Sequence, residues 1–261
     1  MSFPIPEKRP LRIGHRGAAA YAPHNTLTSF RKAAELGADM VELDVQRTVD
    51  GQVVVFHDLF LKAPDGKVLP VHETTLAELQ AVDLRQIFTD LITPDGEPAI
   101  RPVRGPGEYI PTFPEVLATC IQLNLGILLE LKDGHASPLV IEALREQGYA
   151  DHVVISSFRP DWLADFKATV PQIEMSIQCG SKTMDGPHVV QLARACGASF
   201  VCPGYDNHPH PTGLLTPDWL GAVRAGGLRV ISWHEERPAE IAALNRLGVD
   251  GICSNRPDLL P

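Results

Sequence analysis

The chain has 261 residues, of which 44% are hydrophobic and 21% are charged. This composition excludes an intrinsically disordered chain and a coiled coil, and the length suits either one to two average domains or one α/β barrel of about 250 residues. The net charge is −9 and no basic run is present, so we expect no nucleic-acid partner, because a sequence-independent grip on phosphates needs several Lys and Arg.

Membrane and secretory signals are absent from the sequence. No apolar stretch approaches the ~18 residues of a membrane span, and residues 1–14 contain no apolar signal-peptide core. The five cysteines are scattered without a CxxC pair, which is typical of reduced thiols. We therefore expect a cytoplasmic protein with no stable membrane insertion.

The first part of the chain predicts a helix between two strands, followed by a hairpin. These elements are a strand at 12–14, a helix at about 26–36 and a strand at 40–45. The alternating hydrophobic residues that follow pass through Asp50-Gly51, which is typical of a two-residue hairpin turn. Centring the turn on this pair places Asp44 directly opposite His57. We expect the hairpin to rise above the sheet and to return His57 to the level of the acids.

A long excursion, 58–122, separates the second strand from the third. It contains a helical pattern from Thr75 to Val82 and ends in a helix at about 114–123. Loops of this length are usually functional. We interpret about 58–112 as an insertion over the mouth of the fold, with the last helix returning to its wall, and we expect 1–261 to form one domain.

The second half repeats a short strand followed by a helical pattern. The predicted strands are 127–131, 153–157, 174–177, 200–202, 229–233 and 250–253, and the helices lie near 137–147, 160–169, 187–196, 217–225 and 238–247. Prolines begin several of these helices and glycines follow their ends. Together with the first part this makes eight parallel strands, so we predict an α/β fold, a closed TIM (β/α)8 barrel. A doubly wound open sheet is the alternative, but it lacks its usual Gly-rich turn here.

Polar residues stand at the C-terminal ends of three predicted strands, where barrel enzymes carry their sites. They are His15 and Arg16 after the first strand, Glu42 and Asp44 on the second, and Glu130 and Lys132 on the third. Residues two apart on a strand share a face, so the two acids of the second strand point the same way. Satisfied ion pairs are the alternative, but three converging acids beside a Lys, an Arg and a His are more typical of a site.

The residue types at this mouth indicate a reaction class. Three carboxylates without a Cys ligand suit a hard divalent cation, Mg²⁺ or Ca²⁺. Arg16 and Lys132 suit an anionic phosphoryl group, and two histidines, His15 and His57, can act as general acid and base near neutral pH. Together these groups predict hydrolysis of a phosphoester.

Several short motifs occur in a fixed order along nearly the whole chain. They are Gly14-His15-Arg16-Gly17, Pro23-His24-Asn25-Thr26, Glu42-Leu43-Asp44-Val45, Asp50-Gly51 leading to Phe56-His57-Asp58, Leu129-Glu130-Leu131-Lys132, Ser156-Ser157-Phe158, and Gly248-Val249-Asp250-Gly251-Ile252 with Arg256-Pro257. This set resembles the glycerophosphodiester phosphodiesterase family. The resemblance implies a barrel enzyme whose small-molecule substrate, a glycerophosphodiester, is hydrolysed to glycerol 3-phosphate and an alcohol such as choline or ethanolamine.

The resemblance also implies a role for each candidate residue. It assigns the metal to Glu42, Asp44 and Glu130, acid–base catalysis to the two histidines, and phosphate contacts to Arg16 and Lys132. One mechanism proposed for the family uses the glycerol hydroxyl of the substrate as nucleophile, through a cyclic phosphate that water then opens. Which histidine takes the first proton stays open.

The chain departs from the family pattern at three places. His24 stands where the family usually has Glu, which changes the metal environment unless His24 merely caps the following helix near Asn25 and Thr26. Trp233 is shifted by two positions from the family's late Trp, so it keeps its strand face and is expected to wall the substrate pocket. Leu59–Lys62 replaces a common Asp-Arg-Thr-Thr, so recognition of the leaving alcohol does not carry over.

Two other functions compete with this interpretation. A lysophospholipase D-like or phosphoinositide-type enzyme would need an apolar or basic rim, which the insertion could supply through Leu59, Phe60, Leu61, Ile87 and Phe88. A catalytically silent binding protein with the same fold would be expected to lack an acid–base residue or a metal ligand, and all are present. The sequence leaves open the alcohol, the metal used and the oligomeric state.

Overall fold

Eight parallel strands form a closed barrel in the computed structural model, which describes residues 6–88, 107–180, 185–204 and 211–261. The strands are β1 (Leu11–Gly14), β2 (Met40–Arg47), β6 (Gly126–Leu131), β7 (Val153–Ser157), β8 (Glu174–Cys179), β9 (Phe200–Pro203), β10 (Arg229–Ser232) and β11 (Gly251–Ser254). Each strand pairs with the next in this order, and β11 pairs with β1 to close the ring. The predicted TIM barrel is therefore confirmed, and the open-sheet alternative is wrong.

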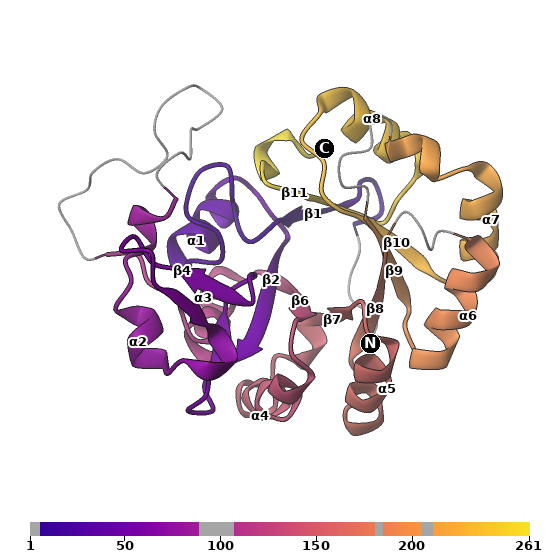
Figure 1. Cartoon of the computed structure of the whole chain (residues 1–261). Coiled ribbons are helices and arrows are strands. Elements are labelled where there is room, and N and C mark those ends of the chain that lie inside the picture. The colour runs from indigo at the N-terminus through magenta and orange to yellow at the C-terminus, as the bar shows by residue number, and fades with distance from the viewer. Residues whose placement is uncertain (1–5, 89–106, 181–184, 205–210) are drawn as a thin grey trace.

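Helices alternate with the strands and surround them (Figure 1). They are α1 (Leu27–Glu35), α3 (Phe113–Leu123), α4 (Ser137–Gln147), α5 (Pro160–Thr169), α6 (Gly186–Cys196), α7 (Pro217–Ala225) and α8 (Pro238–Leu247). Proline stands in the first turn of each helix from α3 to α8, where its missing N–H costs no hydrogen bond. The helices that the sequence predicts around the barrel are all present, with bounds that agree to within one residue. The helical pattern predicted from Thr75 to Val82 contains a shorter helix, α2 (Leu76–Gln80).

The barrel interior is apolar near the start of the strands and polar at their C-terminal ends. An inner hydrophobic cluster includes Met40 on β2 and Leu128 on β6. Inward positions recur every second residue, so Glu42 and Asp44 follow Met40 and Glu130 follows Leu128 on the same faces. A larger cluster fills the space between the strands and the helices. The two-residue repeat of the strands therefore places the acids next to the hydrophobic cluster inside the barrel, on its C-terminal side.

The hairpin after β2 differs from its predicted register. β2 pairs with β3 (Val53–Val55) so that Val45 lies opposite Val55, and Phe56 N donates to Asp44 O at 2.9 Å. Phe56, and not His57, therefore lies opposite Asp44, and the prediction was wrong by one residue. Gly51 has a φ of 79° and its N–H donates to Thr48 O, which is typical of a three-residue loop with a left-handed glycine.

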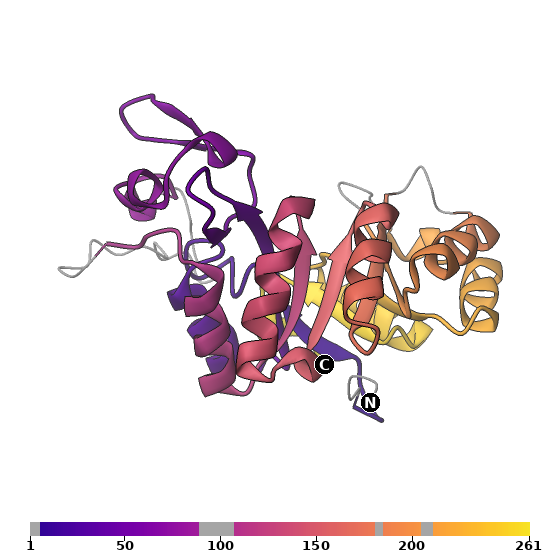
Figure 2. The ribbon, with the colours of Figure 1, turned by 90° about the horizontal axis from the view of Figure 1, so that it is seen from below.

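The insertion has a small hydrophobic core of its own. It contains a two-stranded sheet, a helix and two 3₁₀ turns: β4 (Phe60–Lys62), β5 (Val68–Pro70), α2 (Leu76–Gln80), Val71–Glu73 and Leu84–Gln86. Buried side chains such as Leu61 and Leu79 pack there against Val54 of β3. In Figures 1 and 2 these elements lie outside the ring of helices and project beyond one end of the barrel. The part of the predicted insertion at 89–106 lies outside the described residues.

Two further expectations concern membranes and thiols. Among the residues that the structure describes, no helix combines the length and the apolar character needed to cross a bilayer. The five cysteines are all free and buried, as expected for reduced thiols.

Candidate active site

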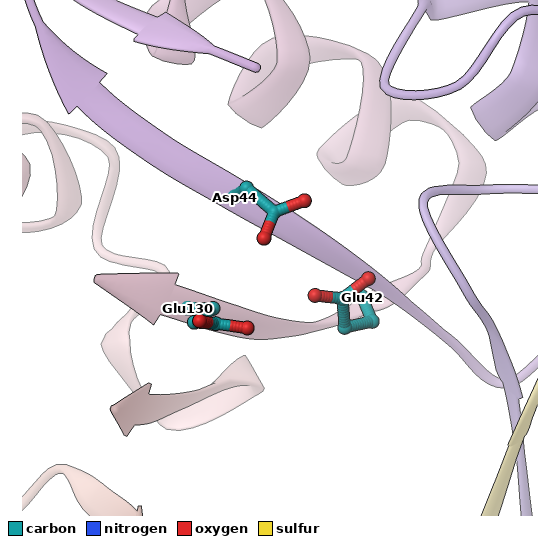
Figure 3. A group of neighbouring side chains, drawn as sticks. All are labelled: Glu42, Asp44 and Glu130. Carbon is teal, nitrogen blue, oxygen red and sulfur yellow. The ribbon is translucent and has the colours of Figure 1, made fainter. Parts of the chain in front are cut away.

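Three carboxylates meet at the C-terminal end of the barrel. Asp44 on β2 lies directly opposite Glu130 on β6, and Glu42 comes two residues before Asp44. All three residues are buried, and one carboxylate oxygen from each lies within 4.8 Å of the other two. Figure 3 shows the carboxyl groups turned to the same side of the two strands. The predicted ligand residues are thus brought together.

The electrostatics of this cluster suit a cation. Burial, followed by the charge of Asp44, raises the pKa of Glu42 well above its usual value and also raises the pKa of Glu130. Within the described residues, Asp44 Oδ1 is buried and accepts no hydrogen bond. Hard divalent cations bind such oxygen donors, so the donor set fits Mg²⁺ or Ca²⁺.

Arg16 and Lys132 contact the same carboxylates. The Arg16 backbone N–H donates to Glu42 Oε2 at 3.0 Å, and its Nε lies 3.5 Å from Asp44 Oδ2. Lys132 Nζ lies 2.5 Å from Glu130 Oε1 and 3.4 Å from Asp44 Oδ1. Burial opposes the charge of Lys132, but these two carboxylates outweigh it and raise the pKa of the ammonium group. Two permanent cations therefore face the space beside the acids, as predicted.

His15 is buried beside the acid cluster and is held by a second group of polar residues. Its Nδ1–H donates to Asn255 Oδ1 at 2.7 Å, and its ring stacks on His234 with centroids 4.5 Å apart. The other nitrogen, Nε2, lies 3.9 Å from Glu42 Oε2. Burial, then Arg16 and His234, lowers the pKa of His15 well below its usual value, so the ring is neutral at pH 7 with Nε2 unprotonated.

His57 lines a cavity of about 590 Å³, which His15 does not line. Its Nδ1–H donates to Asp58 Oδ1 at 2.7 Å, which leaves Nε2 for other partners. Arg16 and Lys132 line one side of the cavity. The apolar part of the lining comes from the insertion: Leu59, Phe60, Leu61, Ile87 and Phe88. The apolar rim that the sequence suggested is therefore present next to His57.

His24 also lines this cavity, and it does not cap α1. The N-cap of α1 is Thr26, whose side chain accepts from Ser29 N, so the capping alternative for His24 is wrong. Its ring instead contacts Phe88, with centroids 4.9 Å apart. Burial, followed by Arg16 and His57, lowers the pKa of His24 to about 4. His24 is thus a neutral ring on the cavity wall, and it does not belong to the group of side chains that could hold a metal ion.

Trp233 follows β10 and packs against the inner hydrophobic cluster. Its Nε1–H donates to Cys202 O at 3.2 Å, and its ring meets Phe158 edge-on with centroids 6.1 Å apart. It is not among the residues that line the cavity beside His57. Its role as a wall for the substrate stays a prediction.

Several residues that support the site received no role from the sequence. Asn25 Nδ2 donates to Asp44 Oδ2 at 2.9 Å from a backbone with a φ of 59°, and Asn is one of the few residues that adopt this conformation readily. Gln178 of β8 hydrogen-bonds Glu130, and Asn255 binds both His15 and His234. Asn25 belongs to the Pro23-His24-Asn25-Thr26 motif on which the family resemblance rests. No sequence signal linked Asn255 or Gln178 to their distant partners.

A closed TIM barrel with buried acids, two cations and two histidines at its C-terminal mouth defines a barrel enzyme of the phosphate-ester type. The profile of the Glycerophosphoryl diester phosphodiesterase family matches residues 15–259. The chain therefore belongs to this family and is an enzyme of the phosphodiesterase class.

Individual relatives match over nearly the full chain. A glycerophosphodiester phosphodiesterase of Bacillus altitudinis is 30% identical over 94% of this chain and 94% of its own length. One from Caldanaerobacter subterraneus subsp. tengcongensis is 28% identical over 96% of each chain.

Solved structures agree in fold. A phosphodiesterase of Oleispira antarctica, crystallised with the product sn-glycerol-3-phosphate, has a TM-score of 0.77 and 23% identity over 96% of this chain and 94% of its own. A glycerophosphodiester phosphodiesterase from Agrobacterium tumefaciens has a TM-score of 0.76 and 24% identity over 95% of this chain and 96% of its own.

Proposed function

We propose that this enzyme hydrolyses glycerophosphodiesters to glycerol 3-phosphate and an alcohol, with a divalent cation and two histidines. The observation that carries the proposal is the joint placement of three buried carboxylates, two cationic side chains and two histidines at one end of the barrel. The similarity to a barrel phosphodiesterase that was crystallised with sn-glycerol-3-phosphate supports this choice of product.

The cation would be held by Glu42, Asp44 and Glu130, and Mg²⁺ and Ca²⁺ both suit these oxygens. When bound, a divalent ion supplies positive charge for a phosphoryl oxygen and for an attacking oxygen. Arg16 and Lys132 would bind the other phosphate oxygens, since both side chains border the acids and the cavity. Trp233 would wall the substrate pocket.

The two histidines would divide the proton transfers. His15 is neutral with Nε2 unprotonated, so it is suited to take the proton from the attacking oxygen. That oxygen forms a bond to phosphorus, the bond between phosphorus and the alcohol oxygen breaks, and its electron pair stays on the alcohol oxygen. His57 Nε2–H would give this oxygen its proton, and Asp58 fixes the ring by accepting from Nδ1. The attacking oxygen is either that of water, which gives glycerol 3-phosphate directly, or the glycerol hydroxyl of the substrate, which gives a cyclic phosphate. In the second case water must then attack phosphorus and break one P–O bond of the ring to give glycerol 3-phosphate.

The catalytically silent alternative finds no support at the site, because all the acids and both histidines are retained. The free, buried cysteines support a cytoplasmic location, where thiols stay reduced.

A coupled assay for glycerol 3-phosphate tests the proposed activity. The enzyme is first freed of metal with EDTA and then assayed on a panel of glycerophosphodiesters with no metal, Mg²⁺ or Ca²⁺. We expect release only with a divalent ion, and loss of release in the His15→Ala variant. If glycerol 3-phosphate appears equally in the presence of EDTA, metal dependence is wrong; if no member of the panel is hydrolysed, the proposed reaction is wrong.

A further inference from the structure

We infer that the cavity beside His57 binds a leaving alcohol that carries a hydrocarbon chain. This inference rests on the proposed function and names its substrate class: glycerophosphodiesters of alkyl alcohols, in preference to those of small charged alcohols. It is carried by the composition of the cavity, by its position relative to the two histidines and by its charges.

The cavity wall exposes apolar side chains that a folded protein normally buries. Leu59 and Phe60 are 62% and 43% exposed, and they border the cavity together with Ile87 and Phe88. The same wall contains Leu61, which belongs to the buried core of the insertion. Apolar side chains gathered on a concave surface are typical of a binding site. A hydrocarbon chain would cover this wall and release the water that now contacts it.

The position of the cavity assigns the hydrocarbon to the leaving side of the substrate. His57 lines the cavity, whereas His15 is buried beside Glu42 and does not line it. The group that departs with a proton from His57 must lie next to His57. Arg16 and Lys132 border both the acids and the cavity, so a phosphate held there would direct its alcohol onto the insertion.

The charges that line the cavity disfavour a cationic alcohol. Arg16, Lys62 and Lys132 contribute three positive groups, and Asp58 is the one carboxylate among the described lining residues. Asp58 already binds His57 at 2.7 Å. Arg16 and Lys132 would be engaged by the acids and the phosphate, so an ammonium group on the alcohol would meet the remaining cation, Lys62, and no unengaged carboxylate among the described lining residues. An alkyl chain meets no such repulsion.

The test is a homologous series of substrates in which only the alcohol grows, from ethanol to n-hexanol, all below their micellar concentrations. Burying one methylene is equivalent to about a fourfold gain, so four added methylenes should raise kcat/KM for glycerol 3-phosphate release by ~250-fold across the series. Glycerophosphocholine should fall near the lower end. A flat or falling series while glycerophosphocholine is hydrolysed would overturn the inference and leave the proposed function standing.

Two variants localise the effect. Leu59→Asn/Phe60→Ser alters only exposed side chains of the wall and should reduce the hexyl-to-ethyl ratio to below about tenfold. Val68→Ser is the matched control, because Val68 lies on the same small sheet, is 54% exposed and does not line the cavity. Its hexyl-to-ethyl ratio should equal that of the unmodified enzyme. Equal ratios in all three proteins would place the hydrocarbon elsewhere.

A second substrate series places the same chain on a glycerol hydroxyl and keeps the alcohol small. If only this series shows a gain with chain length, the assignment to the leaving alcohol is wrong. Calorimetric binding of ethyl and n-hexyl phosphate to the enzyme separates the cavity from the reaction. Tighter binding of hexyl phosphate, lost in Leu59→Asn/Phe60→Ser, supports the cavity even if no diester is hydrolysed, and equal binding of the two overturns it.

Discussion

Asp44 and Glu130 lie directly opposite each other on the parallel strands β2 and β6, and both are buried. Two carboxylates in this position repel each other where little water screens them. The pKa of Glu130 is raised by its burial and then by Asp44, and Glu42 adds a third acid two residues away along β2. Repulsion among these acids therefore destabilises the folded protein when no metal is bound, and a bound cation would remove this destabilisation.

Removing one of these charges should stabilise the metal-free protein while it destroys the site. We expect Glu42→Gln to raise the free energy of unfolding in EDTA by about 1 kcal/mol, a gain of the size seen when functional strain is relieved. This corresponds to a rise in melting temperature of roughly 2–4 °C. The Gln oxygen can still accept from Arg16 N, which now binds Glu42 Oε2 at 3.0 Å. Calorimetric melting measures the change.

Metal addition should raise the melting temperatures of the two proteins to different extents. Mg²⁺ or Ca²⁺ should raise the melting temperature of the unmodified enzyme, because a ligand that binds only the folded state stabilises it, and should raise it less for Glu42→Gln. Glu35→Gln is the control, because Glu35 is exposed and pairs with Lys32 on the surface. If Glu42→Gln melts lower than the unmodified protein in EDTA, repulsion among the three acids does not govern the stability of the metal-free site.

Replacing either histidine should lower turnover by ~10²–10⁴, but the two losses should depend differently on the alcohol. An alcohol that leaves readily, such as p-nitrophenol, needs no proton from the enzyme. With glycerophospho-p-nitrophenol we expect His57→Ala to recover most of its lost kcat, because His57 faces the cavity for the leaving group. His15→Ala should recover little, because its Nε2 acts on the attacking oxygen.

The comparison of the two variants contains its own control, since each is measured on the same pair of substrates. Recovery in His15→Ala with none in His57→Ala would reverse the assignment of acid and base. Near-normal turnover of either variant on glycerophosphocholine would remove that histidine from the reaction.

The sequence predicted the barrel and its acids because both follow from short-range periodicity. Inward positions recur every second residue, so Met40, Glu42 and Asp44 had to share a face. The hairpin register did not follow, because Asp50 of the turn bonds Leu76 N and Val49 N bonds Thr74 O. These contacts with the insertion favour a three-residue loop, and the pattern of residues 45–55 contains no signal of them.

The support of His15 was also beyond the sequence. Asn255 follows β11 and His234 follows β10, and each meets His15 only because the closed barrel brings three separate loops together. The contact between His24 and Phe88 also joins two separate segments of the chain, since Phe88 belongs to the insertion. Residues on one strand could be placed from their spacing; partners from different loops could not.

His24 should have little effect on metal binding. Its ring contacts Phe88 and does not belong to the group of side chains that could share one ion, Glu42, Asp44 and Glu130. We expect the dissociation constant for Mg²⁺ or Ca²⁺, measured by calorimetry, to change less than about threefold in His24→Ala. Asp44→Asn, measured in parallel, should weaken binding by at least ~10-fold, since it removes a ligand. A comparable loss in His24→Ala would add His24 to the ligand set.

The strand that carries the acids is anchored at its start by Asp39, and this anchor should depend on pH. Asp39 accepts hydrogen bonds from Arg9 Nη1 at 2.5 Å and from Arg12 N at 2.8 Å. Burial alone would raise the pKa of Asp39, but these bonds outweigh it and hold the pKa below its usual value. A carboxyl group with a lowered folded-state pKa stabilises the fold above its unfolded pKa of about 3.9, and the effect is lost as the pH falls through the folded value.

Asp39→Asn should therefore destabilise the protein at pH 7 by about 1–2 kcal/mol, the usual value of a hydrogen bond to a charged group that is partly exposed. The difference from the unmodified protein should stay constant from pH 8 to about pH 5 and shrink below about pH 4, where Asp39 takes up a proton first in the unfolded chain and, at lower pH, in the folded one. Urea unfolding at a series of pH values measures it, with the exposed Asp151→Asn as control. A difference that grows as the pH falls would contradict the lowered pKa, because only a group with a raised folded-state pKa behaves in that way.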